Sequence, residues 1–173
     1  RDRHIGKDWR LNELDKVYLE KGFYPAKPSD QPEWVKEVGF GRQSVALTLE
    51  NCYDDWCMSI LAKELGKEDD YQYYLNRAYN YRNVFDSKSG FMRPKTADGK
   101  WIEPFDPIWS GGQGGRDFYT ENNGWNYTWY VLHDPQGLIN LMGGQEPFVA
   151  KLQQMFETNV PLYLSLIHIS EPT

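Results

Sequence analysis

Cysteine is scarce in this chain, which has only Cys52 and Cys57 among its 173 residues. The two lie in a segment of helical periodicity, at a spacing that turns their side chains away from each other, so we expect no disulfide between them. Two thiols without a nearby histidine also do not form a structural zinc site. We therefore expect both cysteines to be small buried apolar side chains.

A basic excess and a long apolar run are missing as well. The chain carries 19 Lys and Arg against 25 Asp and Glu, a formal net charge of −6, and this acidic balance argues against a nucleic-acid partner. No run of about 18 apolar residues occurs, so we expect no membrane span. No signal peptide is visible, but the first residue is Arg1 and not Met. We expect the true amino terminus to lie upstream.

Aromatic residues, in contrast, make up 16% of the chain, which allows a large core. The apolar spacing is mostly helical, with Gly22 and Gly66 placed as helix stops. The short link 66–68 predicts an antiparallel helical hairpin. The expected helices cover 12–21, 44–65, about 69–84, about 120–132, 136–142 and 146–157. The buried stripe of the helix over 44–65 is expected to contain Val45, Leu49, Trp56, Ile60 and Leu65.

Two connections, 23–41 and 86–119, are long for a compact domain. Because they hold aromatic residues as well as prolines and glycines, we expect them to form pocket walls, with plain surface padding as the alternative. The end of the chain has a different rhythm, since apolar residues alternate with a period of two from 162 to 169. The final SLIHISEPT resembles a translated sequencing adapter. We therefore expect 165–173 to be a non-native tail.

The stretch 111–144 combines a glycine-rich turn, carboxylates, amides and aromatic rings. Aromatic faces suit the apolar side of a sugar ring, while amides and carboxylates bind its hydroxyl groups. This chemistry favours a site for a neutral, polyhydroxylated ligand. The alternative is a helix packed through Trp125, Trp129 and Leu132, with its polar residues in solvent.

Three blocks in this order carry a family resemblance: 44–66, SVALTLENCYDDWCMSILAKELG; 79–93, YNYRNVFDSKSGFMR; and 120–144, TENNGWNYTWYVLHDPQGLINLMGG. Together they resemble glycoside hydrolase family 92, the calcium-dependent, exo-acting α-mannosidases, over about 14–157. The resemblance implies an all-α fold, a partial (α/α)6 toroid built of helical hairpins with long loops. This domain would occupy 1–164 and be truncated at both ends.

The resemblance places Glu121 at the position of the general acid, the group that protonates the departing sugar oxygen. The family usually has Gly next, where this chain has Asn122, a difference that we expect to be tolerated. From the residues alone, Glu121 could instead favour the dipole of a helix that begins there. The resemblance puts the general base downstream of this chain. The chain alone is therefore expected to be inactive.

Five further residues are expected to contact substrate. Trp125 follows Glu121 by four residues, which in a helix places both on one face. His133 and Asp134 could orient a substrate hydroxyl, or form a structural pair with each other. Asp54 or Asp55 must face water or a polar cavity, because a buried unpaired carboxylate is too costly. The predicted substrate-binding set is Trp125, Asn122, His133, Asp134 and Asp54.

The implied function is calcium-dependent, inverting hydrolysis of terminal α-linked mannose, with α-mannosides or mannose-containing glycans as the partners of the intact protein. The calcium ligands are expected to lie mostly outside this chain, and no metal-binding residue is assigned here. A periplasmic or extracellular location is expected. Two alternatives stay open: a non-catalytic helical carbohydrate-binding module, and another (α/α)6 glycosidase.

Overall fold

The computed structural model describes residues 13–28, 34–35, 40–41, 43–109 and 118–158. This part of the chain is mostly helical, as expected. The helices are α1 (Glu13–Lys21), α2 (Ser44–Glu64), α3 (Glu68–Ala78), the 3-10 helix η2 (Tyr79–Val84), α4 (Gly124–Tyr127), α5 (Pro135–Leu141) and α6 (Gln145–Glu157). The expected non-native tail over 165–173 lies outside the described residues.

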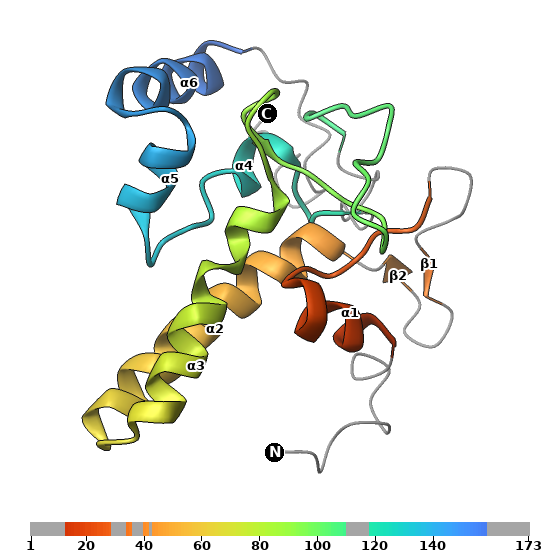
Figure 1. The fold of residues 1–173 in the computed structure, drawn as a ribbon. Helices are drawn as coiled ribbons and strands as arrows, with labels where there is room; N and C mark the ends of the chain where they lie inside the picture. Colours follow the sequence, from red (N-terminus) through yellow and green to blue (C-terminus); the bar gives the residue numbers. More distant parts are fainter. Residues whose placement is uncertain (1–12, 29–33, 36–39, 42, 110–117, 159–173) are drawn as a thin grey trace, which may run out of the picture.

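Helices α2 and α3 form the predicted antiparallel hairpin, which extends away from the rest of the chain (Figure 1). Gly66 makes the turn between them with a φ of +65°, a conformation that glycine adopts without strain. Gly22 ends α1 in the same way at +73°. Both stops predicted from the sequence are confirmed.

Two short strand pairs interrupt the helical pattern, and the helical reading of the sequence did not predict them. Strand β1 (Trp34–Val35) pairs with β2 (Phe40–Gly41), and β3 (Phe85–Asp86) pairs with β4 (Phe91–Met92), both antiparallel. The second pair brings Met92 into contact with the block 120–144, because the Met92 amide donates to the Thr128 hydroxyl at 3.1 Å.

The core lies where the first half of α2 meets η2, the β3–β4 pair and the stretch 119–138. Its buried members are Phe23, Val45, Leu49, Cys52, Tyr81, Val84, Phe85, Met92, Tyr119, Val131 and Leu138. Cys52 is a buried filler as predicted, but Cys57 is exposed, so that half of the cysteine prediction is wrong. Both thiols are free.

The predicted buried stripe of α2 is correct only over its first half. Val45 and Leu49 are fully buried, but Ile60 and Leu65 are 44% and 64% exposed. Over the second half the buried side chains are instead Asp55, Ser59 and Ala62. The distal end of the hairpin thus presents apolar side chains to solvent in this chain. No helix in the described part of the chain is long and apolar enough to cross a membrane.

Candidate functional site

The turn that carries Glu121 is fastened to the start of α2. The Phe118 carbonyl accepts hydrogen bonds from the amides of Val45 and Ala46, both at 3.1 Å. These are among the first amides of α2, which have no partner within the helix and receive no side-chain cap. Next in the chain, the buried Tyr119 hydroxyl donates to the Met92 carbonyl at 2.7 Å. The turn is therefore held from two directions.

Thr120, the residue before Glu121, is held at two points. Its hydroxyl donates to Oε1 of Gln43 at 2.9 Å. Its carbonyl oxygen lies 3.3 Å from the Tyr127 hydroxyl, which donates to it. Contacts from the residue before α2 and from the end of α4 thus fix the backbone where Glu121 begins.

Glu121 itself is exposed and has a φ of +50°. Residues other than glycine rarely adopt this left-handed region, and such strain often gathers at functional sites. The helix begins later, at Gly124, with Asn123 as its N-cap. Glu121 is therefore not in the first turn of a helix, and the helix-dipole interpretation of Glu121 loses its basis.

The expected fourth helix is much shorter than predicted, since α4 covers only Gly124–Tyr127. Because Glu121 is not helical, the four-residue spacing does not place Trp125 on its face. Trp125 is 6% exposed and packs edge-on against Phe91, with ring centroids 4.8 Å apart. The Lys151 ammonium lies 4.9 Å from the indole centroid. Trp129, which the alternative packed-helix interpretation includes, is half-buried and packs edge-on against Phe148 of α6.

Asn122 has its side-chain oxygen engaged at the start of α4. It accepts hydrogen bonds from the Asn123 amide at 3.0 Å and from the side-chain amide of Asn126. The Asn123 side chain in turn accepts from the Asn126 backbone amide at 3.3 Å. The three asparagines therefore fix the short segment between Glu121 and α4.

His133 lies in an aromatic environment. Its ring faces Tyr81, Tyr53 and Trp56, with centroids 5.7, 6.3 and 6.3 Å away. Its Nε2 donates to the Ala78 carbonyl at 2.8 Å, and its buried Nδ1 has no hydrogen-bond partner among the described residues. Burial lowers the pKa of His133, partly offset by that carbonyl and by the nearby carboxylate of the next residue.

Asp134 contacts other groups than His133, so the predicted structural pair does not form. Its Oδ2 accepts from the Tyr81 hydroxyl at 2.6 Å and from Arg82 at 3.4 Å, and its Oδ1 accepts from the Gly137 amide at 2.9 Å as the N-cap of α5. Burial alone raises the pKa of Asp134, but the hydrogen bonds from Tyr81 and Gly137 more than offset this, so the pKa lies below its usual range.

Asp54 is exposed, whereas Asp55 is buried and paired, as the cost of an unpaired carboxylate requires. The Arg77 Nε lies 2.8 Å from Oδ2 of Asp55, and the Tyr18 hydroxyl donates to the same oxygen at 3.2 Å. Asp55 is thereby a structural residue that joins α1, α2 and α3. Of the two neighbouring aspartates, Asp54 is the one whose carboxylate is exposed.

A second carboxylate close to the Glu121 turn was missed by sequence reasoning. Glu50, one helical turn before Asp54, is half-buried, and its Oε1 lies 3.3 Å from the Tyr127 hydroxyl, which thus has a second acceptor besides the Thr120 carbonyl. Burial raises the pKa of Glu50, the hydrogen bond from Tyr127 opposes the rise, and Asp54 adds to it. The four-residue spacing of the two acids on one helix was visible in the sequence, but the Tyr127 contact was not.

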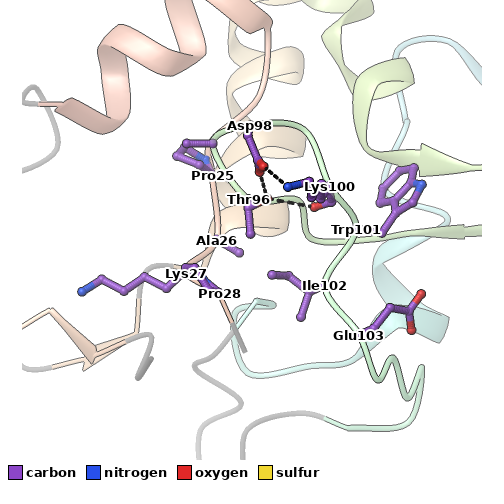
Figure 2. Close-up of a pocket in the computed structure, with 11 residues that line it drawn as sticks. Pro25, Ala26, Lys27, Pro28, Thr96, Asp98, Lys100, Trp101, Ile102 and Glu103 are labelled. Carbon is purple, nitrogen blue, oxygen red and sulfur yellow. Dashed lines mark hydrogen bonds and ion pairs between the residues drawn. The ribbon is translucent and has the colours of Figure 1, made fainter. Parts of the chain in front are cut away.

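A pocket of about 700 Å³ lies between the two long connections (Figure 2). The segment 25–28 forms one wall and 96–103 the other, so the prediction that both connections line a pocket is confirmed. The walls are joined by a hydrogen bond from the Ala26 amide to the Lys95 carbonyl at 2.7 Å. At the rim, Lys100 pairs with Asp98 at 2.8 Å.

Calcium, which the family resemblance implies, is bound by several oxygen ligands, among which carboxylates are prominent. Within the described ranges, no group of three or more His, Cys, Asp or Glu side chains lies close enough to hold a metal ion. The acidic side chains near the Glu121 turn do not form such a group. The described part of the chain therefore does not fit a calcium ion through these side chains.

A model of the glycosyl hydrolase family 92 catalytic domain matches residues 3–167 of the chain. The chain belongs to glycosyl hydrolase family 92. Two solved structures from Bacteroides thetaiotaomicron are similar to this family 92 chain, each with 36% sequence identity. One is a family GH92 α-mannosidase in complex with mannoimidazole, with a TM-score of 0.72 over 90% of this chain and 19% of that chain. The other is a family GH92 inverting mannosidase, with a TM-score of 0.66 over 81% and 17%.

A curated relative from the fungus Arthroderma benhamiae is described as an uncharacterized secreted glycosidase. It is 32% identical, and the match covers 83% of this family 92 chain and 20% of the relative. The chain thus spans about a fifth of the length of these relatives.

Proposed function

We propose that this chain is the part of a full-length α-mannosidase that supplies the general acid. In this proposal the enzyme removes terminal α-linked mannose with inversion, and Glu121 protonates the departing glycosidic oxygen. Membership of family 92 supports the reaction class. The observation that carries the residue assignment is the exposed, left-handed Glu121 on a turn fixed by its preceding residues.

An inverting glycosidase needs a second carboxyl group about 6.5–9.5 Å from the acid, with room for a water molecule between them. We place this general base outside the chain, in agreement with the small share of its relatives that the chain covers. The chain alone is then inactive. Helical hairpins such as α2–α3 would complete an (α/α)6 toroid together with the rest of the full-length protein.

Among the predicted substrate contacts, Asp54 has the most open side chain and is our choice for binding a sugar hydroxyl. The side-chain oxygens of Asn122 and Asp134 are engaged within the chain, and Trp125 is buried. We propose that Asn122, Trp125, His133 and Asp134 form a supporting layer behind the residues that contact the sugar. Because no cluster of His, Cys, Asp or Glu side chains occurs among the described residues, we place most of the calcium ligands beyond them.

We propose that the full-length protein acts on mannosides outside the cytoplasm. The fungal relative is described as secreted, and this supports an extracellular or periplasmic location for the full-length protein. The substrate class is supported by the relative that was solved in complex with mannoimidazole.

The test uses the full-length protein with Glu121→Gln and two substrates, an α-mannobiose and 2,4-dinitrophenyl α-mannoside. Dinitrophenolate is a weak base that leaves without a proton, whereas a sugar alkoxide needs one. We expect kcat on mannobiose to fall by roughly 10³-fold and kcat on the dinitrophenyl substrate to fall by about tenfold or less. Glu146→Gln, an exposed change on α6, is the matched control.

Equal losses on both substrates would refute the acid role of Glu121. NMR of the first product distinguishes inversion, which gives β-mannose, from retention. A carbohydrate-binding module would release no mannose at all and would lose only affinity, and another toroid glycosidase would prefer a glucoside over the mannoside.

A further inference from the structure

The Tyr127 hydroxyl has two acceptors and one hydrogen. Its oxygen lies 3.3 Å from Oε1 of Glu50 and 3.3 Å from the Thr120 carbonyl oxygen. Burial raises the pKa of Tyr127 to about 12, so the hydroxyl keeps its hydrogen at neutral pH. A single hydrogen makes one good hydrogen bond at a time. The state of Glu50 therefore decides which acceptor receives it.

Two arrangements follow from the chemistry of the carboxyl group. A protonated Glu50 can donate to the Tyr127 oxygen, which leaves the tyrosine hydrogen for the Thr120 carbonyl. An ionised Glu50 can only accept, and a hydrogen bond to a charged oxygen is the stronger one, so it draws the hydrogen away from Thr120. Burial raises the pKa of Glu50 and Asp54 adds to the rise, which favours the protonated form, although a hydrogen bond from Tyr127 opposes it.

The Thr120 carbonyl belongs to the peptide group that precedes Glu121. That group is planar, so holding its oxygen also holds the amide nitrogen of Glu121. Rotation about the next bond is the φ of Glu121, which has the unusual value of +50°. A hydrogen bond to the Thr120 oxygen therefore acts directly on the conformation that aims the Glu121 side chain.

We propose that Glu50 is a positioning residue for Glu121, acting through the Tyr127 hydroxyl on the Thr120 carbonyl. The inference rests on the proposed function of Glu121 as the general acid. Glu50 does not touch the departing oxygen in this arrangement. Its effect is to keep the carboxyl of Glu121 aimed while the glycosidic bond breaks.

The experiment compares Glu50→Gln, Glu50→Ala and Tyr127→Phe in the full-length protein, on the same mannobiose and dinitrophenyl substrates. A glutamine amide can donate to the tyrosine oxygen and so keep its hydrogen directed at the Thr120 carbonyl, whereas alanine removes that donor and leaves the hydroxyl free to turn to water. We expect Glu50→Ala and Tyr127→Phe to lower kcat on mannobiose by about 10- to 100-fold, as loss of aim by a general acid can. The loss on the dinitrophenyl substrate should be about threefold or less, and Glu50→Gln should recover most of the mannobiose activity.

Glu64→Ala, an exposed change near the end of α2, is the matched control and should act like the wild type. Equal losses of Glu50→Ala or Tyr127→Phe on both substrates would overturn the inference, because damage to the fold does not depend on the leaving group. A Glu50→Gln enzyme as impaired as Glu50→Ala would also overturn it. If Glu50→Ala does not fold, Tyr127→Phe decides alone.

The Glu121→Gln enzyme separates the two proposals. If it shows the leaving-group dependence and the Glu50 and Tyr127 variants do not, only the positioning role is lost. If Glu121→Gln itself lacks that dependence, both proposals are wrong.

Discussion

Gln43 and Thr120 are joined by a hydrogen bond of 2.9 Å between their side chains, across 77 residues of sequence. Gln43 immediately precedes α2 and has a φ of +54°, in the left-handed region. A strained residue at the start of one helix thus holds the turn that carries Glu121. Substitution by glycine removes the strain and the contact together, with opposite effects on stability.

Gln43→Gly should leave the stability of the full-length protein almost unchanged while lowering its activity. Glycine relieves about 1 kcal/mol of left-handed strain, and the lost hydrogen bond costs about 1 kcal/mol. We expect a melting temperature within about 2 °C of the wild type and a loss of roughly 3- to 10-fold in kcat on mannobiose. Unchanged kcat would show that the Thr120 hydroxyl contact does not help to aim Glu121.

Asp55→Ala should destabilise the α2–α3 hairpin strongly. The substitution leaves the half-buried Arg77 guanidinium and the buried Tyr18 hydroxyl without their shared acceptor. Breaking a buried ion pair from one side costs about 3 kcal/mol. Hydrogen exchange of α2 and α3 amides in the full-length protein measures the loss. Asp54→Ala, the exposed neighbour, should change the same amides by less than about 0.5 kcal/mol, and similar effects of the two variants would contradict this account.

Gly137→Ala should disrupt the start of α5. A Cβ atom at this buried position would overlap Oδ2 of Asp134 and the Tyr81 hydroxyl, which are joined by a 2.6 Å hydrogen bond. Overpacking of this kind costs about 2 kcal/mol, visible as faster hydrogen exchange in α5 and a lower melting temperature. Gln136→Ala, the exposed neighbour on α5, is the control, and equal behaviour of both variants would exclude a steric origin.

The sequence predicted the long helices well because their signals are local. Gly22 lies directly after α1, and Gly66 lies two residues after the end of α2. The short strand pairs and the early end of α4 were missed. The apolar pattern gave a wrong prediction for the second half of α2, because Asp55 is buried with Arg77 while Ile60 is exposed.

In the candidate site, the sequence-based predictions depend mainly on the family resemblance of the block 120–144. The sequence proposes Glu121 as a site residue but does not predict its place on a turn outside the helix, because that turn is shaped by the bonds of Phe118 to the start of α2. Glu50 was missed because its partner Tyr127 is 77 residues away. Contacts of this range depend on the packing of the whole chain and leave no local pattern.

The ion pair between Asp86 and Arg93 indicates how the free energy of unfolding depends on pH. Their side chains are 6% and 7% exposed, and Arg93 lies 2.8 Å from Oδ2 of Asp86. Burial alone raises the pKa of Asp86, but the hydrogen bonds from Arg93 and the Lys88 amide help to bring it below its ordinary value of 3.8. A carboxyl whose folded pKa is depressed stabilises the fold above its unfolded pKa, and this contribution is lost as the pH falls through the folded pKa.

Asp86→Asn should therefore lower the melting temperature of the full-length protein at neutral pH and reduce its fall in acid. The variant lacks the ionised carboxylate, so it has no such contribution to lose between about pH 5 and pH 2. Melting curves at several pH values give the difference between wild type and variant, which should narrow as the pH falls below about 4. A difference that stays constant over this range would mean that the charge of Asp86 contributes nothing and that the substitution acts only through packing.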